Sequence, residues 1–235
     1  MRPPADATAR FAAARGEPHL ILASASPRRQ QILSHVGVSY TVVPSEVDER
    51  PLASEAPEAL ATRLAQEKAR VAAAQFPDDV ALAADTVVAL GIKSLGKPSG
   101  PAEAIEVLQQ LRGRSHRVIT AVATARVQGS NIEIAHRASV TEVWMRAYSD
   151  DEIRAYVASG DPLDKAGGYA IQHAGFRPVE RFEGCYLNVV GLPLPEVLDL
   201  LREAGLGNLS IDRAALEPIC PGCRDLARLP ISDGL

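Results

Sequence analysis

Two adjacent arginines follow a serine-rich turn near the start of the chain. Ser24 and Ser26 precede a proline and then Arg28 and Arg29, directly after the short apolar run 19–23. Serine is a preferred helix N-cap, and proline suits the first helical position. A helix N-terminus attracts anions through its free amide groups and its dipole, and arginine adds paired donors for phosphate oxygens. The segment therefore predicts a phosphate site, and a capped helix with two solvated arginines is the alternative.

Carboxylates occur at two places that suit a divalent cation. Asp85 interrupts the apolar run Val80–Leu90, where a carboxylate is costly unless it is paired or bound to a metal. Glu46, Asp48 and Glu49 share one short turn. Hard oxygen ligands suit Mg²⁺ or Mn²⁺. These residues predict a metal site, and a solvated acidic loop is the alternative interpretation of the turn.

Three lysines and a glutamine complete the residues that could act on a ligand. Lys68 lies in a long alanine-rich segment expected to be helical, where a plain surface position is the alternative. Lys97 and Lys165 lie in turns rich in glycine and proline, and functional residues often occur in such loops. Gln172 ends a short apolar segment. Its amide can pair with buried backbone groups or with a base edge that offers one donor and one acceptor.

A Cys-x-x-Cys motif is formed by Cys220 and Cys223 near the C-terminus. This spacing is half of a zinc site, and the third cysteine, Cys185, is distant in sequence. The motif is interpreted either as a tail turn with two thiols or as a zinc ion shared between two chains. Three cysteines are too few for a disulfide framework, so we expect a reducing compartment, the cytoplasm.

Hydrophobic patterning predicts the elements that must position these residues. Alternating and continuous apolar runs indicate strands, and apolar residues at helical spacing indicate helices. The order of elements gives a mixed α/β class, with 1–18 as a flexible leader, 19–205 as the folded domain and 206–235 as a tail. Strands are expected at 19–23, 40–43, 80–90 and 169–172, with a hairpin of 118–127 and 132–145. Helices are expected at 27–36, 57–75, 101–111, from the Ser149 cap to 158, and 193–205.

Composition excludes several classes of protein. The 235 residues include 25 Lys and Arg against 29 Asp and Glu, a formal net charge of −4. This balance argues against a nucleic-acid polymer as partner, because phosphate backbones are bound by basic surfaces. Aromatic residues make up only 4% of the chain, which also disfavours a base-stacking surface. We expect no membrane span, since the longest apolar run is far shorter than the roughly 20 residues that a span needs.

Taken together and in this order, the motifs resemble the Maf family of nucleoside triphosphate pyrophosphatases, also called septum-formation inhibitor-like. They are Ser24–Arg29, Glu67–Ala69, Asp85–Val88, Gly96–Pro98, Ser115–Val118, Asp164–Gly167 and Asn188–Pro193. The resemblance covers residues 19–205. It implies a two-lobed fold with a central mixed sheet and a deep cleft, similar to inosine-triphosphate pyrophosphatases. It also implies a homodimer that hydrolyses a nucleoside triphosphate to the monophosphate and diphosphate with a divalent metal.

The resemblance assigns roles to individual residues. The proton acceptor of the family corresponds to Asp85, which we also expect to contact the metal together with Glu49. The specificity positions match the subgroup that acts on dTTP and UTP, whereas the 7-methyl-GTP subgroup has a tryptophan in place of the first arginine. These positions are Arg28, Thr86 and Gln172.

Charge that develops on the phosphates must be met by cations, so basic residues of the motifs are expected to act in catalysis or to hold the phosphates. Lys68 and Lys97 are the expected catalytic cations. The expected phosphate-binding residues are Ser24, Ser26, Arg28, Arg29 and Lys165.

Two positions depart from the family pattern, and three other functions remain open. Ala121 stands where members have glycine, and Cys185 stands where an acidic residue is common. The alternatives are a pyrophosphatase for other non-standard triphosphates, a nucleotide-binding regulator of cell division, and a zinc-linked interaction module built on the tail. An intact phosphate site with a defective base would favour the regulator, and the presence of Asp85 favours an enzyme.

Overall fold

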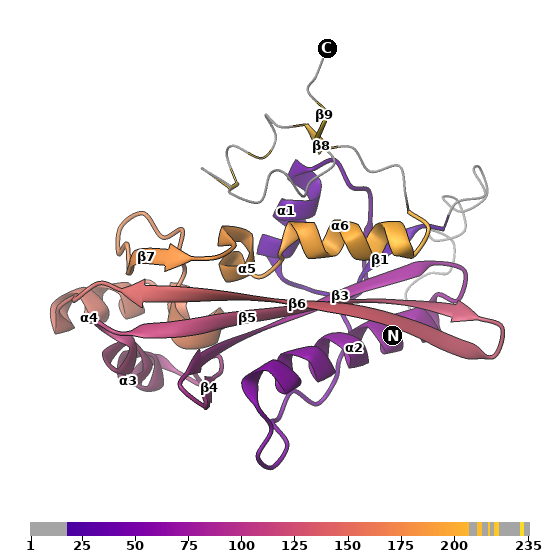
Figure 1. Cartoon of the computed structure of the whole chain (residues 1–235). Helices are drawn as coiled ribbons and strands as arrows, with labels where there is room; N and C mark the ends of the chain where they lie inside the picture. Colours follow the sequence, from indigo (N-terminus) through magenta and orange to yellow (C-terminus); the bar gives the residue numbers. More distant parts are fainter. Residues whose placement is uncertain (1–17, 207–210, 213–215, 217–218, 221–230, 233–235) are drawn as a thin grey trace.

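A mixed β-sheet forms the centre of the protein (Figure 1). The computed structural model describes residues 18–206, 211–212, 216, 219–220 and 231–232. In this part of the chain the sheet has seven strands, in the order β2-β1-β3-β5-β6-β7, with β4 paired to β3. Strand β1 is parallel to β2 and β3, and the other pairs are antiparallel. The strands are β1 (Leu20–Leu22), β2 (Thr41–Val42), β3 (Val80–Leu90), β4 (Lys93–Leu95), β5 (Ser115–Gln128), β6 (Asn131–Met145) and β7 (Val179–Glu183).

Helices cover both faces of the sheet. Helix α2 lies along one face, and α1, α5 and α6 lie on the other, while α3 and α4 pack together at one end (Figure 1). The helices are α1 (Pro27–His35), α2 (Pro57–Gln75), α3 (Pro101–Leu111), α4 (Asp150–Ala158), α5 (Tyr186–Val190) and α6 (Leu194–Glu203). Two 3₁₀ turns, Asp161–Asp164 and Ala166–Gly168, follow α4. The expected mixed α/β class is confirmed.

Strand β3 shows why this sheet is buried on both faces. Side chains of a strand point alternately to opposite faces. Val80 and Leu82 accordingly join the apolar cluster that includes α1 and α6. Ala81 and Ala83 join the cluster with α2, whose inner face is mostly alanine. Small side chains let α2 lie close to the sheet, so polar groups on α2 and β3 are brought within contact.

Several expected elements have the predicted bounds. Strand β3 spans 80–90, and helices α2 and α3 span 57–75 and 101–111. Helix α4 begins with the expected capping box, in which Ser149 and Glu152 bind each other's backbone amides. Helix α1 begins at the expected proline, although the Ser26 side chain makes no capping hydrogen bond.

One expected strand is wrong, and several short elements were not expected. Residues 169–172 form no strand, because side-chain contacts and not ladder pairing bury this apolar run. No pattern in the sequence predicted β4, β7, α5 or the two 3₁₀ turns. Strand β7 is an edge strand rich in charged residues, a composition that keeps an edge from pairing with other chains and hides its apolar period.

Parts of the expected tail contribute to the core. Ile211, Leu216 and Cys220 are buried in the same cluster as the apolar face of α6. Two short strands, β8 (Ile211–Asp212) and β9 (Ile231–Ser232), pair in parallel. Cys223 and the leader 1–17 lie outside the described residues.

Among the described residues, no helix combines the length and the apolar character needed to cross a membrane.

Candidate active site

A cleft of about 600 Å³ opens beside β1 and β3, at the first turn of α1. All of the residues to which the family resemblance gave a role line it, whereas Glu46 and Asp48 of the acidic turn do not. The lining candidates are Ser24, Ser26, Arg28, Arg29, Glu49, Lys68, Asp85, Thr86, Lys97, Lys165 and Gln172. These side chains come from α1, α2, β3 and several loops, so the fold gathers positions that are up to 148 residues apart (172 − 24) in the sequence.

The side chains of two adjacent residues of β3 point to opposite faces of the sheet. Asp85 continues the row of Ala81 and Ala83 and faces α2, whereas Thr86 faces α1. Ala121, the departure from the family pattern, lies directly opposite Asp85 in the register of β3 and β5 and is fully buried. Its methyl group therefore takes part in the packing beneath the carboxylate.

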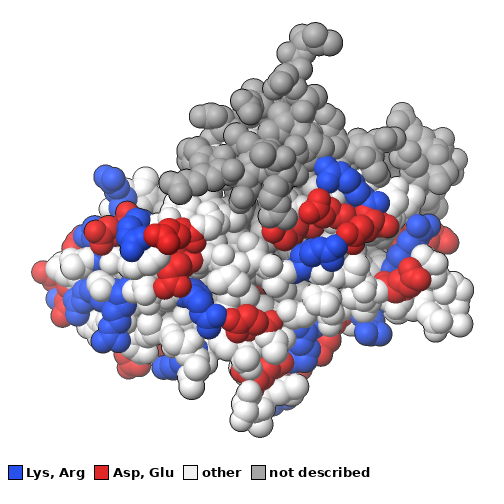
Figure 2. All heavy atoms as spheres, in the orientation of Figure 1, with Lys and Arg blue, Asp and Glu red and all other residues white. Residues whose placement is uncertain are grey.

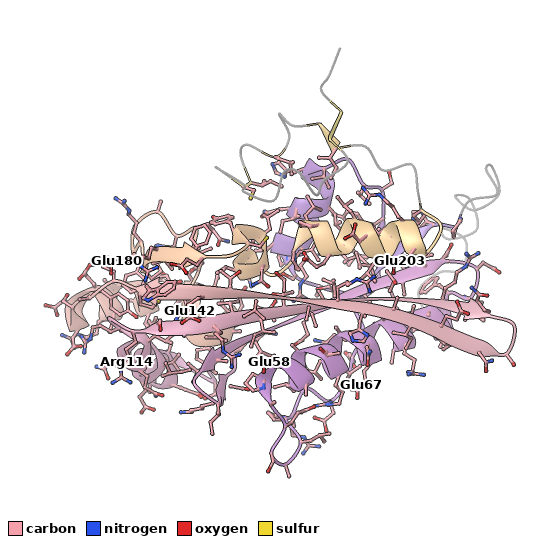
Figure 3. The ribbon with its side chains drawn as sticks, in the orientation of Figure 1. Glu58, Glu67, Arg114, Glu142, Glu180 and Glu203 are labelled. Carbon is pink, nitrogen blue, oxygen red and sulfur yellow. The ribbon has the colours of Figure 1, made fainter. Side chains whose placement is uncertain are left out.

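Lys68 joins the two carboxylates expected to bind metal. Its Nζ donates to Asp85 Oδ1 at 2.7 Å and to Glu49 Oε1 at 2.6 Å. The side chain of the neighbouring Glu67, labelled on α2 in Figure 3, is 41% exposed, whereas that of Lys68 is only 10% exposed. A buried ammonium needs such partners, because desolvation of an unpaired charge is costly.

The two carboxyl groups are shifted in opposite directions. Burial raises the pKa of Asp85, and the charge of Lys68 offsets this only in part. Burial also raises the pKa of Glu49, but the hydrogen bond and charge of Lys68, together with the charges of Lys97 and Arg29, outweigh burial and the net pKa is lowered. A raised carboxyl pKa brings Asp85 closer to the range in which a group exchanges protons near neutral pH.

Arg29 ties three segments together on the other side of β3. Its guanidinium donates to Ser24 Oγ at 3.0 Å, to the Gly191 carbonyl at 2.9 Å and to Thr86 Oγ1 at 3.2 Å. Burial lowers the pKa of Arg29, and Asp85 opposes the shift. Gly191 has φ +113°, and a Cβ there would lie 3.2 Å from Thr86 Oγ1, so this position suits glycine.

A chain of hydrogen bonds continues from Thr86 into the core. Thr86 Oγ1 lies 2.9 Å from Thr120 Oγ1, which donates to the Asn188 carbonyl at 2.9 Å. The fully buried Asn188 side chain also accepts from the Thr120 amide and donates to Val118 and Thr141. Because the Thr120 hydrogen is used on Asn188, the Thr86 hydroxyl donates to Thr120 and accepts from Arg29. The Thr86 hydroxyl thus orients Arg29.

A second set of charges lies in the 3₁₀ turns, which also line the cleft. Lys165 Nζ donates to Asp161 Oδ1 at 3.0 Å and to Asp164 Oδ1 at 2.6 Å. Arg28 reaches the same Asp164 at 3.4 Å. Lys97 and Gln172 are exposed, and no described residue hydrogen-bonds to either side chain. The Lys97 ammonium and the Gln172 amide are therefore both free to bind a ligand.

Sequence reasoning missed three residues that support the cleft. His116 and Asn188 lie within the quoted motifs, but neither was given a role. Tyr169 was placed in an expected strand, whereas its ring lines the cleft. The signal available for Asn188 was a polar residue among apolar neighbours, Leu187 and Val189. An amide that is buried with such neighbours must find hydrogen-bond partners.

Glu49 and Asp85 fit a divalent cation. The described residues contain no group of three or more His, Cys, Asp or Glu side chains that would hold a metal by themselves. The two carboxylates are nonetheless hard donors, and the Lys68 ammonium between them shows that a positive charge is favoured there. Mg²⁺ commonly binds one or two carboxylates and completes its shell with water and substrate phosphates. The donor set therefore fits Mg²⁺ or Mn²⁺ when a polyphosphate is bound.

Comparison with known proteins adds independent findings. Residues 19–204 match the family of Maf-like proteins. A dTTP/UTP pyrophosphatase of Thermomicrobium roseum is 49% identical over 205 residues, covering 87% of this chain and 92% of the relative. A protein of the same name from Myxococcus xanthus is 48% identical, covering 80% and 93%. Among solved structures, a HAM1 protein from Coxiella burnetii matches 56% of this chain and 74% of its own, with 21% identity and a TM-score of 0.40.

Proposed function

The chain belongs to the family of Maf-like proteins, and from this premise we propose that it hydrolyses dTTP and UTP to the monophosphate and diphosphate. The observation that carries the proposal is a buried carboxylate, Asp85, in a cleft lined by five cationic side chains. These are Arg28, Arg29, Lys68, Lys97 and Lys165. The two relatives named dTTP/UTP pyrophosphatase that are described above are 48–49% identical to this chain over the matched residues. The enzyme is a hydrolase of phosphoanhydride bonds.

The reaction follows from these side chains. Water attacks the α-phosphorus, its proton passes to Asp85, and the bond between that phosphorus and the bridging oxygen breaks to release diphosphate. Asp85 accepts the proton more readily than an ordinary carboxylate, because burial raises its pKa. The cationic side chains stabilise the charge that develops on the phosphate oxygens. A divalent cation held by Glu49 and Asp85 would supply further charge neutralisation and acidify bound water.

Phosphate binding is assigned to the turn at the start of α1. Ser24, Ser26 and Arg28 lie at the helix N-terminus, where amide groups attract anions. Arg29 is held in a fixed orientation by its three hydrogen bonds and presents its charge to the same end of the cleft. Lys165 faces it from the 3₁₀ turns. A substrate phosphate would compete for Arg28 with Asp164, which pairs with it at 3.4 Å.

Base selection is assigned to Gln172, with Arg28 and Thr86 as the other specificity positions. The open amide of Gln172 has one acceptor and two donors, which match O4 and N3–H of uracil or thymine. A site that hydrogen-bonds its ligand discriminates strongly, because a mismatched base leaves polar groups unpaired. Thr86 would act through Arg29, whose guanidinium it orients. Modified pyrimidines that keep the same edge fit the same site.

The proposal extends to the setting of the enzyme. We propose that it works in the cytoplasm as a homodimer with Mg²⁺ or Mn²⁺. The net charge of −4 supports a small nucleotide and not a nucleic-acid polymer as partner. Among the described residues on the face drawn in Figure 2, acidic and basic side chains are interspersed and form no continuous basic patch.

The test is diphosphate release from dTTP, UTP, CTP, ITP, GTP and 7-methyl-GTP, each with Mg²⁺ or Mn²⁺. Preferential release from dTTP and UTP supports the proposal with its base assignment. Preference for another base retains the reaction and rejects Gln172 as the reader. No release from any of them by a correctly folded protein rejects the enzyme and favours the nucleotide-binding regulator.

A further inference from the structure

The wall of the cleft that carries Gln172 lacks strand pairing. Residues 170–173 form a turn, closed by the His173 amide, which donates to the Ala170 carbonyl at 3.2 Å. Gln172 is a central residue of this turn, so the direction of its amide depends on how the turn is held. A loop without ladder bonds must be fixed by other contacts if it is to present a side chain accurately.

Two buried tyrosine hydroxyls hold the start of this turn. Tyr169 Oη lies 2.7 Å from His116 Nε2 on β5, and the two rings meet edge to face. The Ala170 amide donates to Tyr156 Oη at 3.1 Å, and that hydroxyl donates to Asp161 Oδ2 at 2.6 Å. The turn is therefore tied to β5 through one tyrosine and to α4 through the other.

Burial of the polar His116 side chain at this position costs free energy of folding. The residue is 2% exposed, and its Nδ1 is buried with no hydrogen-bond partner among the described residues. Burial lowers the pKa of His116 to about 4, so the ring is neutral near pH 7. An apolar side chain of similar volume would avoid the unpaired nitrogen. What the histidine provides and a leucine would not is the hydrogen bond to Tyr169.

We propose that His116 and Tyr169 are positioning residues for base recognition: their hydrogen bond fixes the turn from which Gln172 reads the pyrimidine. The inference rests on the proposed function, since it concerns the same cleft. The cationic side chains that bind the phosphates come from other elements. Loss of the hydrogen bond therefore affects the KM for pyrimidine nucleotides and the preference between bases, and it leaves kcat largely unchanged.

Tyr169→Phe is the primary test, because it removes only the hydroxyl. Tyr148→Phe is its matched control. Tyr148 is a buried tyrosine in the same apolar cluster whose hydroxyl donates to the Leu108 carbonyl at 2.8 Å, away from the cleft. For Tyr169→Phe we expect the KM for dTTP and UTP to rise about five- to tenfold, as for one lost hydrogen bond, with kcat within about twofold. The Tyr148→Phe enzyme should keep the wild-type KM.

A second readout does not depend on turnover. Hydrogen exchange at the amides of residues 170–173, measured by mass spectrometry, should be faster in Tyr169→Phe and unchanged in Tyr148→Phe. His116→Leu should give the same changes, and the double variant should add little to either single one, as expected for partners of one interaction. Wild-type exchange and wild-type KM in a Tyr169→Phe enzyme would overturn the inference. A wild-type protein that releases no diphosphate while Tyr169→Phe still loosens the turn would instead overturn the proposed function.

Discussion

Lys68 Nζ lies 2.7 Å from Asp85 Oδ1 and joins α2 to the centre of β3. Both side chains are nearly buried, at 10% and 12% exposed. Each charge therefore depends on the other for compensation, and the pair sets the protonation of the proposed base. The position of Lys68 on the inner face of α2, among alanines that let the helix approach the sheet, makes this contact geometrically available.

Asp85→Asn should abolish most turnover and leave the fold intact. The amide keeps the shape of the carboxyl group but cannot accept the proton, and a positioned base contributes about 10²–10⁴ in rate. We expect kcat for dTTP to fall at least about a hundredfold. Asp151→Asn, at an exposed position on α4, serves as the control. Turnover near the wild-type rate in a pure Asp85→Asn preparation would remove Asp85 from the reaction.

Lys68→Met should move the acid limb of the pH–rate profile to higher pH. Burial raises the pKa of Asp85 and the Lys68 charge holds it back, so removing that charge lets the pKa rise further. The base is active when deprotonated, and a higher pKa means that activity is lost at a higher pH as the solution is acidified. The profile of kcat/KM with dTTP measures this. Lys93→Met, outside the cleft, should keep the wild-type profile, and an unmoved limb in Lys68→Met would argue against the coupling.

Gln172→Glu should weaken the preference for dTTP and UTP. A carboxylate offers only acceptors, so it faces the O4 carbonyl of the base without a donor. We expect kcat/KM for dTTP and UTP to fall about tenfold or more relative to GTP, as for a lost hydrogen bond with an unpaired group. Gln128→Glu, at the exposed end of β5, is the control. Unchanged relative rates across the nucleotides would reject Gln172 as the base reader.

Long, strongly patterned elements could be predicted from the sequence, and short ones could not. Helix α2 and strand β3 carry enough apolar positions to define a period, so their bounds agree with the expectation. Strand β4 has three residues and α5 has five, too few for any period. Tyr169 and Ala170 were misassigned because an apolar run shows burial but not the contacts that cause it.

The residues that line the candidate cleft could be predicted from the order of the motifs, but the contacts among their side chains could not. The motifs, through the family resemblance, predicted that Arg29, Thr86 and Lys68 lie near a ligand, and the structure gathers them around one cleft. The contacts of these side chains depend on the alternation of residues along β3, because Asp85 and Thr86 point to opposite faces of the sheet. The alternation of side chains along β3 can be predicted from the sequence. The residues of α1 and α2 that they contact can be identified only once the packing of these helices on the sheet is known.

Ile211→Ala should lower stability without changing catalysis. Ile211 lies in the segment expected to be a tail, yet it is fully buried in the cluster with α6. Truncation of a buried isoleucine costs about 2–5 kcal/mol. Ile92, which is 94% exposed, provides the matched control, and Ile92→Ala should be nearly neutral. Urea unfolding measures both, and a loss in Ile211→Ala no larger than in the control would separate Ile211 from the core.

His116 should make the protein less stable as pH falls below 6.5. Burial lowers its folded-state pKa from 6.5 to about 4, so the unfolded chain binds the proton first. The stability from the neutral histidine is complete above pH 6.5 and is lost progressively as pH falls toward 4. From the size of the shift the loss is about 2 kcal/mol between pH 6.5 and 5.

The free energy of unfolding, measured in urea at several pH values, tests this expectation. In His116→Leu the decline between pH 6.5 and 5 should be smaller by about 2 kcal/mol, because no group there titrates. His136→Gln, at an exposed position on β6, should keep the wild-type slope. Comparison between these proteins cancels the contribution of Asp85, whose raised pKa acts with the opposite sign. Equal slopes in all three would mean that His116 is protonated in the folded protein as easily as in the unfolded chain.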